Sequence, residues 1–272
     1  MRFASFKNPC SIQSVSPLTD DQMRNVVPSI FAVEQHQSRS DRYTYIPTID
    51  ILNGLRKEGF QPFMACQTRV RDADKRAFTR HMIRMRHNSK IGKDCVNEII
   101  LLNSHDGTAC YQMIAGTFRF VCSNGLVVGD TYSDVKVRHK GNVQHNVIEG
   151  AFQVLESFDR IDESRSEMEE LVLSEDEQEA FAKAAIPLKY EDLHVPIKSD
   201  QLLMPRRRAD TGNDLWTTFN CVQENMIRGG VQGRSAKGKS TTTRPITGVD
   251  QSVKLNRALW TLAEEMKRLK RT

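Results

Sequence analysis

The chain has 272 residues, of which 39% are hydrophobic and 27% charged, and its formal net charge is +5. That apolar share is too high for a mostly disordered protein, and the length suffices for one large domain or two small ones. No apolar run reaches the length of a secretion signal or a membrane span. We therefore expect a cytoplasmic protein that makes no membrane contact.

The charged residues are unevenly distributed. Residues 69–93 contain nine Lys/Arg against two Asp, residues 156–192 contain four Lys/Arg against thirteen Asp/Glu, and residues 201–272 contain fourteen Lys/Arg against six Asp/Glu. The modest net charge therefore conceals strong local fields of alternating sign.

The N-terminal residues 1–45 are polar and interrupted by prolines, and we interpret them as an arm with short local structure. A helix is then expected to begin at Pro47-Thr48, where Thr48 can act as a cap, and to end at Gly59.

Strand patterns follow this helix. The predicted strands cover residues 60–71, 79–87, 97–103, 109–122 and 126–129. Turns such as Asp106-Gly107 connect them, so they predict an antiparallel β-meander. Within the strand over 79–87, the alternation of side chains places Arg80, Arg84 and Arg86 on one face.

The second half of the chain is predicted to be helical, because apolar residues recur there at helical spacing. The predicted helices cover residues 145–160, 164–185, 214–228 and 250–270. Ser174 and Glu177 have the spacing of a capping box. Residues 229–248 are rich in Gly, Ser, Thr and Lys, and we interpret them as a flexible loop.

These elements predict an α+β fold, with an antiparallel β-meander packed against amphipathic helices and a helical C-terminal part. We expect an N-terminal arm over 1–45, an α+β core domain over 46–200, and a basic helical region over 201–272 that carries the loop.

One motif matches a phosphate loop by letter: Gly233 to Ser240 reads G-x-x-x-x-G-K-S. A working phosphate loop lies between a strand and the first turn of a helix, whose amides cradle the phosphate. Here a helix precedes the motif, and Pro245 lies where the following helix would have to form. We therefore interpret it as a basic loop.

Metal and catalytic patterns are missing from the sequence. The six cysteines include no C-x-x-C pair, so we expect free thiols. The seven histidines include no H-E-x-x-H motif, and we expect them to be packing or surface residues. We expect no catalytic residues, no metal and no cofactor, and thus no enzyme.

Basic residues gather on the predicted strands, after the meander, before the helix over 214–228 and in the loop. We expect the nucleic-acid-binding residues to be Arg69, Arg71, Arg80, Arg84, Arg86, Lys136, Arg138, Lys140, Arg206, Arg207, Arg208, Arg234, Lys237, Lys239 and Arg244. Strand arginines can also form the solvated face of a half-buried sheet, and that alternative stays open.

Three stretches carry a family resemblance: Glu98 to Gly107 with Phe118 to Gly129, Val147 to Gly150, and Gln223 to Gly230 with Leu255 to Trp260. They resemble the domain-of-unknown-function family 932 of phages and plasmids, over about residues 45–268. The resemblance implies a mobile genetic element in a bacterial cytoplasm.

A basic β-meander followed by a long amphipathic helix is also similar to the core of Rad52-type single-strand annealing proteins. That similarity implies a homo-oligomer that holds single-stranded DNA in a basic groove during recombination or replication. It rests on the order of elements and on charge, because no diagnostic residue motif is shared.

The leading hypothesis is therefore a protein that binds single-stranded DNA. A second hypothesis is a counter-defence protein that binds a host protein or a nucleotide signal, with the acidic segment 156–192 docking on a basic partner. A third is a nucleotide-dependent enzyme that uses residues 233–240.

Overall fold

The structure, a computed structural model, describes residues 10–33, 46–70, 74–89, 95–106, 109–120, 124–128, 134–138, 142–190 and 195–271. The chain divides into two compact units. The first unit comprises residues 1–120 and 132–158, and the second comprises residues 121–131 and 159–272.

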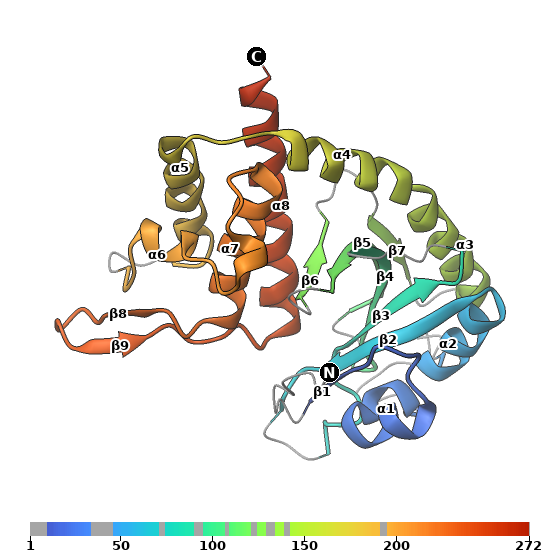
Figure 1. The fold of residues 1–272 in the computed structure, drawn as a ribbon. Helices are drawn as coiled ribbons and strands as arrows, with labels where there is room; N and C mark the ends of the chain where they lie inside the picture. The colour runs from blue at the N-terminus through green and yellow to red at the C-terminus, as the bar shows by residue number, and fades with distance from the viewer. Residues whose placement is uncertain are drawn as a thin grey trace. The chain divides into compact units, whose positions relative to one another are not determined.

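The first unit is built on an antiparallel sheet (Figure 1). Its strands follow the order β1 (Ser11–Gln13), β2 (Phe60–Gln67), β3 (His81–His87), β4 (Cys95–Asn103) and β5 (Tyr111–Arg119), with β7 (Asp134–Val137) also paired to β5. Strands β2 to β5 pair consecutively and antiparallel. The predicted β-meander is therefore confirmed.

Two helices, α2 (Thr48–Lys57) and α3 (Val143–Glu156), pack against this sheet. Strand β4 is buried along its whole length, which its run of β-branched and leucine residues allows. The helix predicted over 145–160 ends earlier than expected: Ser157 caps α3 and donates to the Val154 carbonyl (2.7 Å).

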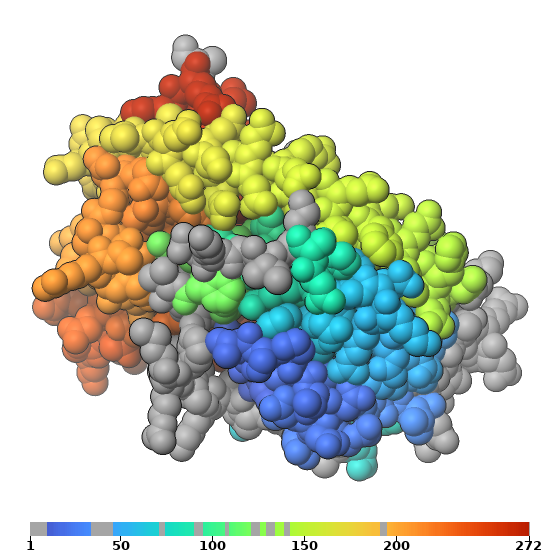
Figure 2. Space-filling view, turned by 45° about the vertical axis from the view of Figure 1, so that its right-hand side comes forward, coloured from blue at the N-terminus to red at the C-terminus, as the bar shows by residue number. Residues whose placement is uncertain are grey.

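The described part of the predicted N-terminal arm belongs to this core. It forms β1, α1 (Asp20–Val26) and η1 (Pro28–Phe31), in which Met23 and Ile30 are fully buried. Thr19 caps α1, and Asp20 pairs with Arg56 of α2 at 2.7 Å. Figure 2 shows these dark-blue residues packed against the lighter blue segment that contains α2. Packing against α2 and β2 therefore orders a segment whose polar composition indicated an arm.

The second unit is mainly helical, as the sequence predicts. Its elements are β6 (Asn124–Val127), α4 (Phe158–Glu170), α5 (Glu175–Ala185), η2 (Ile186–Leu188), α6 (Ser199–Leu203), η3 (Arg208–Asp210), α7 (Leu215–Arg228), β8 (Gln232–Arg234), β9 (Ser240–Thr242) and α8 (Val249–Lys270). The capping box of Ser174 and Glu177 is present at the start of α5.

Helix α7 lies at the centre of the second unit and packs against α5, α6, η3 and α8. Trp216 and Phe219 on α7 pack against Trp260 on α8, with ring centroids 6.2 and 5.9 Å from that of Trp260. All residues of α7 from Leu215 to Met226 are buried, including its polar ones. A helix that is buried on every side must satisfy those polar groups inside the protein.

The segment over 229–248, predicted as a loop, contains an antiparallel hairpin of β8 and β9. Alternating exposure and a run of three threonines suit strands here, and Gly238 supplies a positive φ of 73° at the turn. The Gly, Ser and Lys content alone could not reveal this pairing.

Candidate nucleic-acid interface

The strand arginines of the first unit do not form the expected open basic face. Arg84 donates from Nε to Glu98 (2.5 Å), and Arg86 donates from Nε to the other carboxylate oxygen of Glu98 (2.8 Å). The three side chains are 5%, 9% and 0% exposed, respectively. One buried carboxylate on β4 therefore holds both guanidiniums of β3 inside the sheet, and the expectation that they line a groove is corrected.

Arg86 is further enclosed by aromatic rings. Its guanidinium carbon lies 4.2 Å from the ring centre of Phe63 and 4.6 Å from that of Phe118. Cation–π contacts of this kind strengthen when the cation is removed from water. Arg86 therefore acts as a core residue of the first unit.

The other basic candidates of the first unit differ in exposure. Arg69, Lys136 and Arg138 are exposed, whereas Arg80 is half-buried. Lys136 has an ion pair with Asp134 at 3.6 Å. Two further candidates, Arg71 and Lys140, lie outside the described residues.

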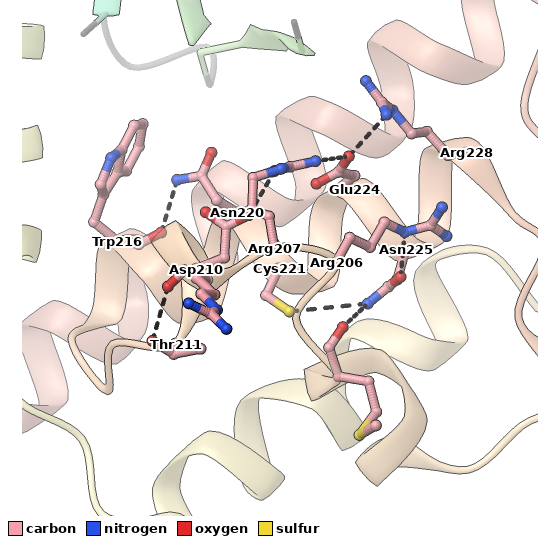
Figure 3. Close-up of polar contacts among 12 residues, drawn as sticks. Arg206, Arg207, Asp210, Thr211, Trp216, Asn220, Cys221, Glu224, Asn225 and Arg228 are labelled. Carbon is pink, nitrogen blue, oxygen red and sulfur yellow. Dashed lines mark hydrogen bonds and ion pairs between the residues drawn. The ribbon is translucent and has the colours of Figure 1, made fainter. Parts of the chain in front are cut away.

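The consecutive arginines that precede α7 differ in whether their side chains are bound within the protein (Figure 3). Arg207 donates to Asp210 (2.5 Å) and to Glu224 on α7 (2.6 Å), and Arg228 also pairs with Glu224 (3.0 Å). Arg208 is exposed. Arg207 is therefore bound into the fold rather than presented to a ligand.

Arg206 connects this cluster to the hairpin. It donates from Nε to the Asn225 side-chain oxygen (2.7 Å) and from a terminal nitrogen to the Gly229 carbonyl (2.5 Å). Asn225 in turn donates to the carbonyls of Leu202 (2.9 Å) and Met204 (3.0 Å). The cluster thus fixes the segment before α7 to the point where the chain leaves α7 for β8.

Sequence reasoning did not single out Glu224 and Asn225. The predicted helix over 214–228 is amphipathic, and its polar face is the kind that sequence patterns assign to solvent, so no local signal indicated that this face is buried. Burial also raises the pKa of the neighbouring Cys221 thiol to about 12, so that thiol stays protonated and unreactive.

The hairpin root is anchored along the outer edge of β8. The Arg234 amide donates to the Pro196 carbonyl (2.8 Å), and the Gln201 side chain donates to the Gln232 carbonyl (2.7 Å). A Cβ on residue 233 would lie 2.0 Å from the Pro196 oxygen, so only glycine fits there. The 196–201 segment therefore covers this edge of the hairpin.

The basic side chains of the hairpin remain at the surface. Arg234, Lys237, Lys239 and Arg244 are all exposed, and residues 229–248 contain no Asp or Glu. The hairpin extends from the helices of the second unit, with Lys237 and Lys239 in its turn (Figure 1). Among the described residues of the predicted interface, the hairpin presents a continuous basic element to solvent.

The phosphate-loop match lies in this hairpin. The turn closes through hydrogen bonds from the Ser235 amide to the Lys239 carbonyl (2.9 Å) and from the Gly238 amide to the Ser235 carbonyl (2.8 Å). Strand β9 begins at Ser240, where a phosphate loop would begin a helix. The strand–loop–helix geometry that binds nucleotide phosphates is therefore missing at residues 233–240.

A separate buried polar cluster in the first unit surrounds Thr48. The Thr48 hydroxyl lies 3.0 Å from Nε2 of His81, 3.1 Å from Nε2 of His105, and 3.0 Å from the Asn103 amide nitrogen. The Nδ1 atom of His81 is 3.2 Å from the Thr79 carbonyl, which can only accept, so Nε2 of His81 accepts from Thr48.

Desolvation by burial is the main cause that lowers the pKa of His81 to about 3, and it is followed by the nearby His105. His81 is therefore neutral at ordinary pH, and this cluster joins α2 to the sheet. The expectation of packing histidines is confirmed for His81 and His105, which are both buried.

Metal and membrane features are missing from the part of the chain that the structure describes. No group of three or more His, Cys, Asp or Glu side chains there could hold a metal ion. Within the same ranges, no helix combines the length and apolar character needed to cross a bilayer.

Comparisons with known proteins define the family. The chain belongs to the family described as Domain of unknown function (DUF932), whose model matches residues 35–260. Among its relatives are UPF0380 protein YafZ and UPF0380 protein YfjQ, both of Escherichia coli (strain K12). Each is 54% identical to this chain over 250 residues, which are 92% of this chain and 92% of the relative.

No solved structure matches the chain. The predicted family membership is confirmed, whereas the similarity to Rad52-type annealing proteins stays a prediction.

Proposed function

We propose that this chain is a nucleic-acid-binding protein of a mobile genetic element and that the β8–β9 hairpin is its principal contact. The observation that carries the proposal is the exposure of Arg234, Lys237, Lys239 and Arg244 within residues 229–248, which contain the hairpin and no acidic residue. Such a concentration of cations attracts phosphates and releases their counterions.

The contribution of each basic region to this proposal follows from its surroundings. Arg84, Arg86 and Arg207 are engaged by buried carboxylates and are removed from the proposed interface. Arg206 supports the hairpin at Gly229, and so acts on binding indirectly. The exposed Arg69, Lys136, Arg138 and Arg208 stay as secondary contacts.

A homo-oligomeric state, a cytoplasmic location and single-stranded DNA as one polymer that the protein binds remain proposals from the sequence. The annealing role within recombination or replication belongs to the same set. Electrostatic binding requires no catalytic residue, and in this proposal the protein acts without a cofactor.

The alternative of a docking surface for a host protein depends on free acidic residues in the 156–192 segment. Part of that segment is engaged within the second unit: Glu167 pairs with Lys267 (3.0 Å) and with Arg271 (2.7 Å), and Glu177 pairs with Lys270 (2.5 Å). These ion pairs reduce the charge available to a partner. The nucleic-acid proposal therefore has the stronger physical support.

The test compares two double variants that remove equal charge. Lys237→Ala with Lys239→Ala removes both cations of the hairpin turn. The control, Lys183→Ala with Arg268→Ala, removes two exposed cations that pair with Glu179 and Glu265 on their own helices. Binding to a fluorescently labelled 30-nucleotide DNA is measured by anisotropy from about 50 to 200 mM salt.

We expect the hairpin variant to reduce the salt slope of log Kd by about 1.4, since each phosphate contact with single-stranded DNA contributes about 0.7. The control variant should keep the slope of the unmodified protein. The proposal is wrong if the unmodified protein does not bind nucleic acid, or if both variants lose the same affinity.

A further inference from the structure

We infer that the β8–β9 hairpin enters the major groove of double-stranded DNA and contacts base edges there. This inference rests on the proposed nucleic-acid binding and specifies its substrate. It differs from the sequence-based expectation of an unpaired strand, because the hairpin geometry was not visible in the sequence.

The first reason is the division of the hairpin into two faces. Residues pair as Gln232 with Thr242, Gly233 with Thr241, and Arg234 with Ser240. Because side chains alternate along a strand, Gln232, Arg234, Ser240 and Thr242 share one face, and all four are exposed. Gly233 and Thr241 lie on the other face and are half-buried, with Gly233 against Pro196.

The second reason is the chemistry of the exposed face. It presents a guanidinium, a carboxamide and two hydroxyls, and no apolar side chain. Arginine donates in bidentate fashion to guanine, and glutamine bonds in the same way to adenine, at edges that only the major groove displays without ambiguity. Gln232 and Arg234 are two residues apart, or about 6.7 Å along the strand, which is close to the rise of two base pairs.

The third reason is the size of the element and the placement of its charge. Two paired strands are about 4.8 Å apart, and the major groove, about 12 Å wide, accepts a two-stranded ribbon. Because the 196–201 segment borders the outer edge of β8 and the Gly233 face, the ribbon would enter with its turn and its Gln232–Arg234 face foremost. Lys237 and Lys239 occupy the turn, and Arg244 lies beyond the opposite end of the ribbon. A ribbon seated in the groove would bring these cations toward the phosphates on either side.

The fourth reason concerns other nucleic acids. Residues 229–248 contain no Phe, Tyr or Trp, and stacking on aromatic rings supplies much of the affinity of single-strand binders. The major groove of an RNA duplex is too deep and narrow for side chains to read. Neither a single strand nor an RNA duplex therefore offers base edges that the Gln232–Arg234 face could read.

The first experiment measures anisotropy with three probes of one sequence: a 24-base-pair DNA duplex, its single strand, and the RNA duplex. The DNA sequence is obtained by selection from a random duplex library. We expect the DNA duplex to bind at least about tenfold more tightly than either other probe, since one bidentate contact supplies that factor. Equal or tighter binding of single-stranded DNA or of the RNA duplex overturns the inference and leaves the proposed function standing.

The second experiment separates base contacts from phosphate contacts. Arg234→Ala should reduce discrimination between the selected duplex and a scrambled duplex by about tenfold, and Gln232→Ala should do so without changing the salt slope. Lys239→Ala should weaken binding to both duplexes alike and reduce the slope by about one. Unchanged discrimination in both Gln232→Ala and Arg234→Ala would rule out groove reading.

Dimethyl sulfate protection provides a readout that does not depend on affinity. Dimethyl sulfate methylates guanine N7, which lies in the major groove, so a protein bound there protects that atom. We expect protection of guanines in the selected duplex that Arg234→Ala relieves. Binding without any N7 protection would contradict the inference, whereas failure to bind all three probes would overturn the proposed function itself.

Discussion

Two basic regions of this protein have similar residue types in opposite surroundings. On β3, Arg84 and Arg86 share the carboxylate of Glu98 and are almost completely buried. On the β8–β9 hairpin, Lys237 and Lys239 lie exposed in a segment without acidic residues. A buried carboxylate within reach turns arginines into structural residues, whereas its absence from a surface hairpin leaves the cations available to phosphates.

The largest expected effect on stability comes from removing the buried carboxylate that Arg84 and Arg86 share. Glu98→Gln leaves two guanidiniums in the sheet without their shared carboxylate. We expect the free energy of unfolding to fall by about 3–5 kcal/mol, measured by urea denaturation. Glu163→Gln, at an exposed position of α4, should change it by less than about 0.5 kcal/mol. A similar small change in Glu98→Gln would contradict the role assigned to this ion-pair cluster.

A second expected effect concerns the histidine cluster in the same unit. Burial lowers the pKa of His81 from 6.5 to about 3, so the unfolded chain binds a proton between these values while the folded chain does not. The free energy of unfolding should therefore fall as pH decreases below about 6.5, by up to about 1.4 kcal/mol per pH unit.

Urea denaturation between about pH 7 and pH 5 tests this dependence, because His81 contributes there before carboxylates protonate. His81→Gln should flatten the dependence, whereas His145→Gln, at an exposed position of α3, should keep it. An unchanged slope in His81→Gln would show that other groups cause the acid sensitivity.

The hairpin root gives an intermediate effect. Gly229 and Gly230 both have positive φ, but a Cβ on Gly229 would lie 2.6 Å from the Thr243 oxygen, whereas a Cβ on Gly230 meets nothing within 4 Å. Gly230→Ala should cost about 1 kcal/mol through backbone strain alone. Gly229→Ala should cost about 1–3 kcal/mol more, by thermal unfolding. Equal costs would show that the contact between α7 and the hairpin is not tight.

The smallest expected effect on stability comes from the exposed lysines of the β8–β9 hairpin. Lys237→Ala with Lys239→Ala should change the free energy of unfolding by less than about 0.5 kcal/mol, because no buried contact is lost. The same variant is expected to lose nucleic-acid affinity. A large loss of stability instead would mean that these lysines hold the hairpin together.

Local patterns predicted much of the fold. The segment over 97–103, with its run of Ile and Leu, indicated strand β4, and the spacing of Ser174 and Glu177 indicated the cap of α5; both are present. The helix over 214–228 was likewise predicted, and Asp214 caps it. These features depend on hydrogen bonds and side-chain faces within a few residues, so the sequence carries them directly.

The candidate site was less predictable, because its residues meet across long sequence separations. Arg84 finds Glu98 on the neighbouring strand, and Arg207 finds Glu224 across 17 positions. No local sequence pattern near either arginine predicts which carboxylate it pairs with. The pairing of β8 with β9 likewise depends on the Pro196 carbonyl and on the space left at Gly233.

The sequence alone determined the class of the fold, the family and the alternation of basic and acidic segments, since periodicity, motif letters and charge are local properties. Tertiary structure decided which charges are neutralised inside and which remain at the surface. The physical reason is that burial removes water from an ion and requires an opposite charge in contact, and only the folded chain brings those groups together.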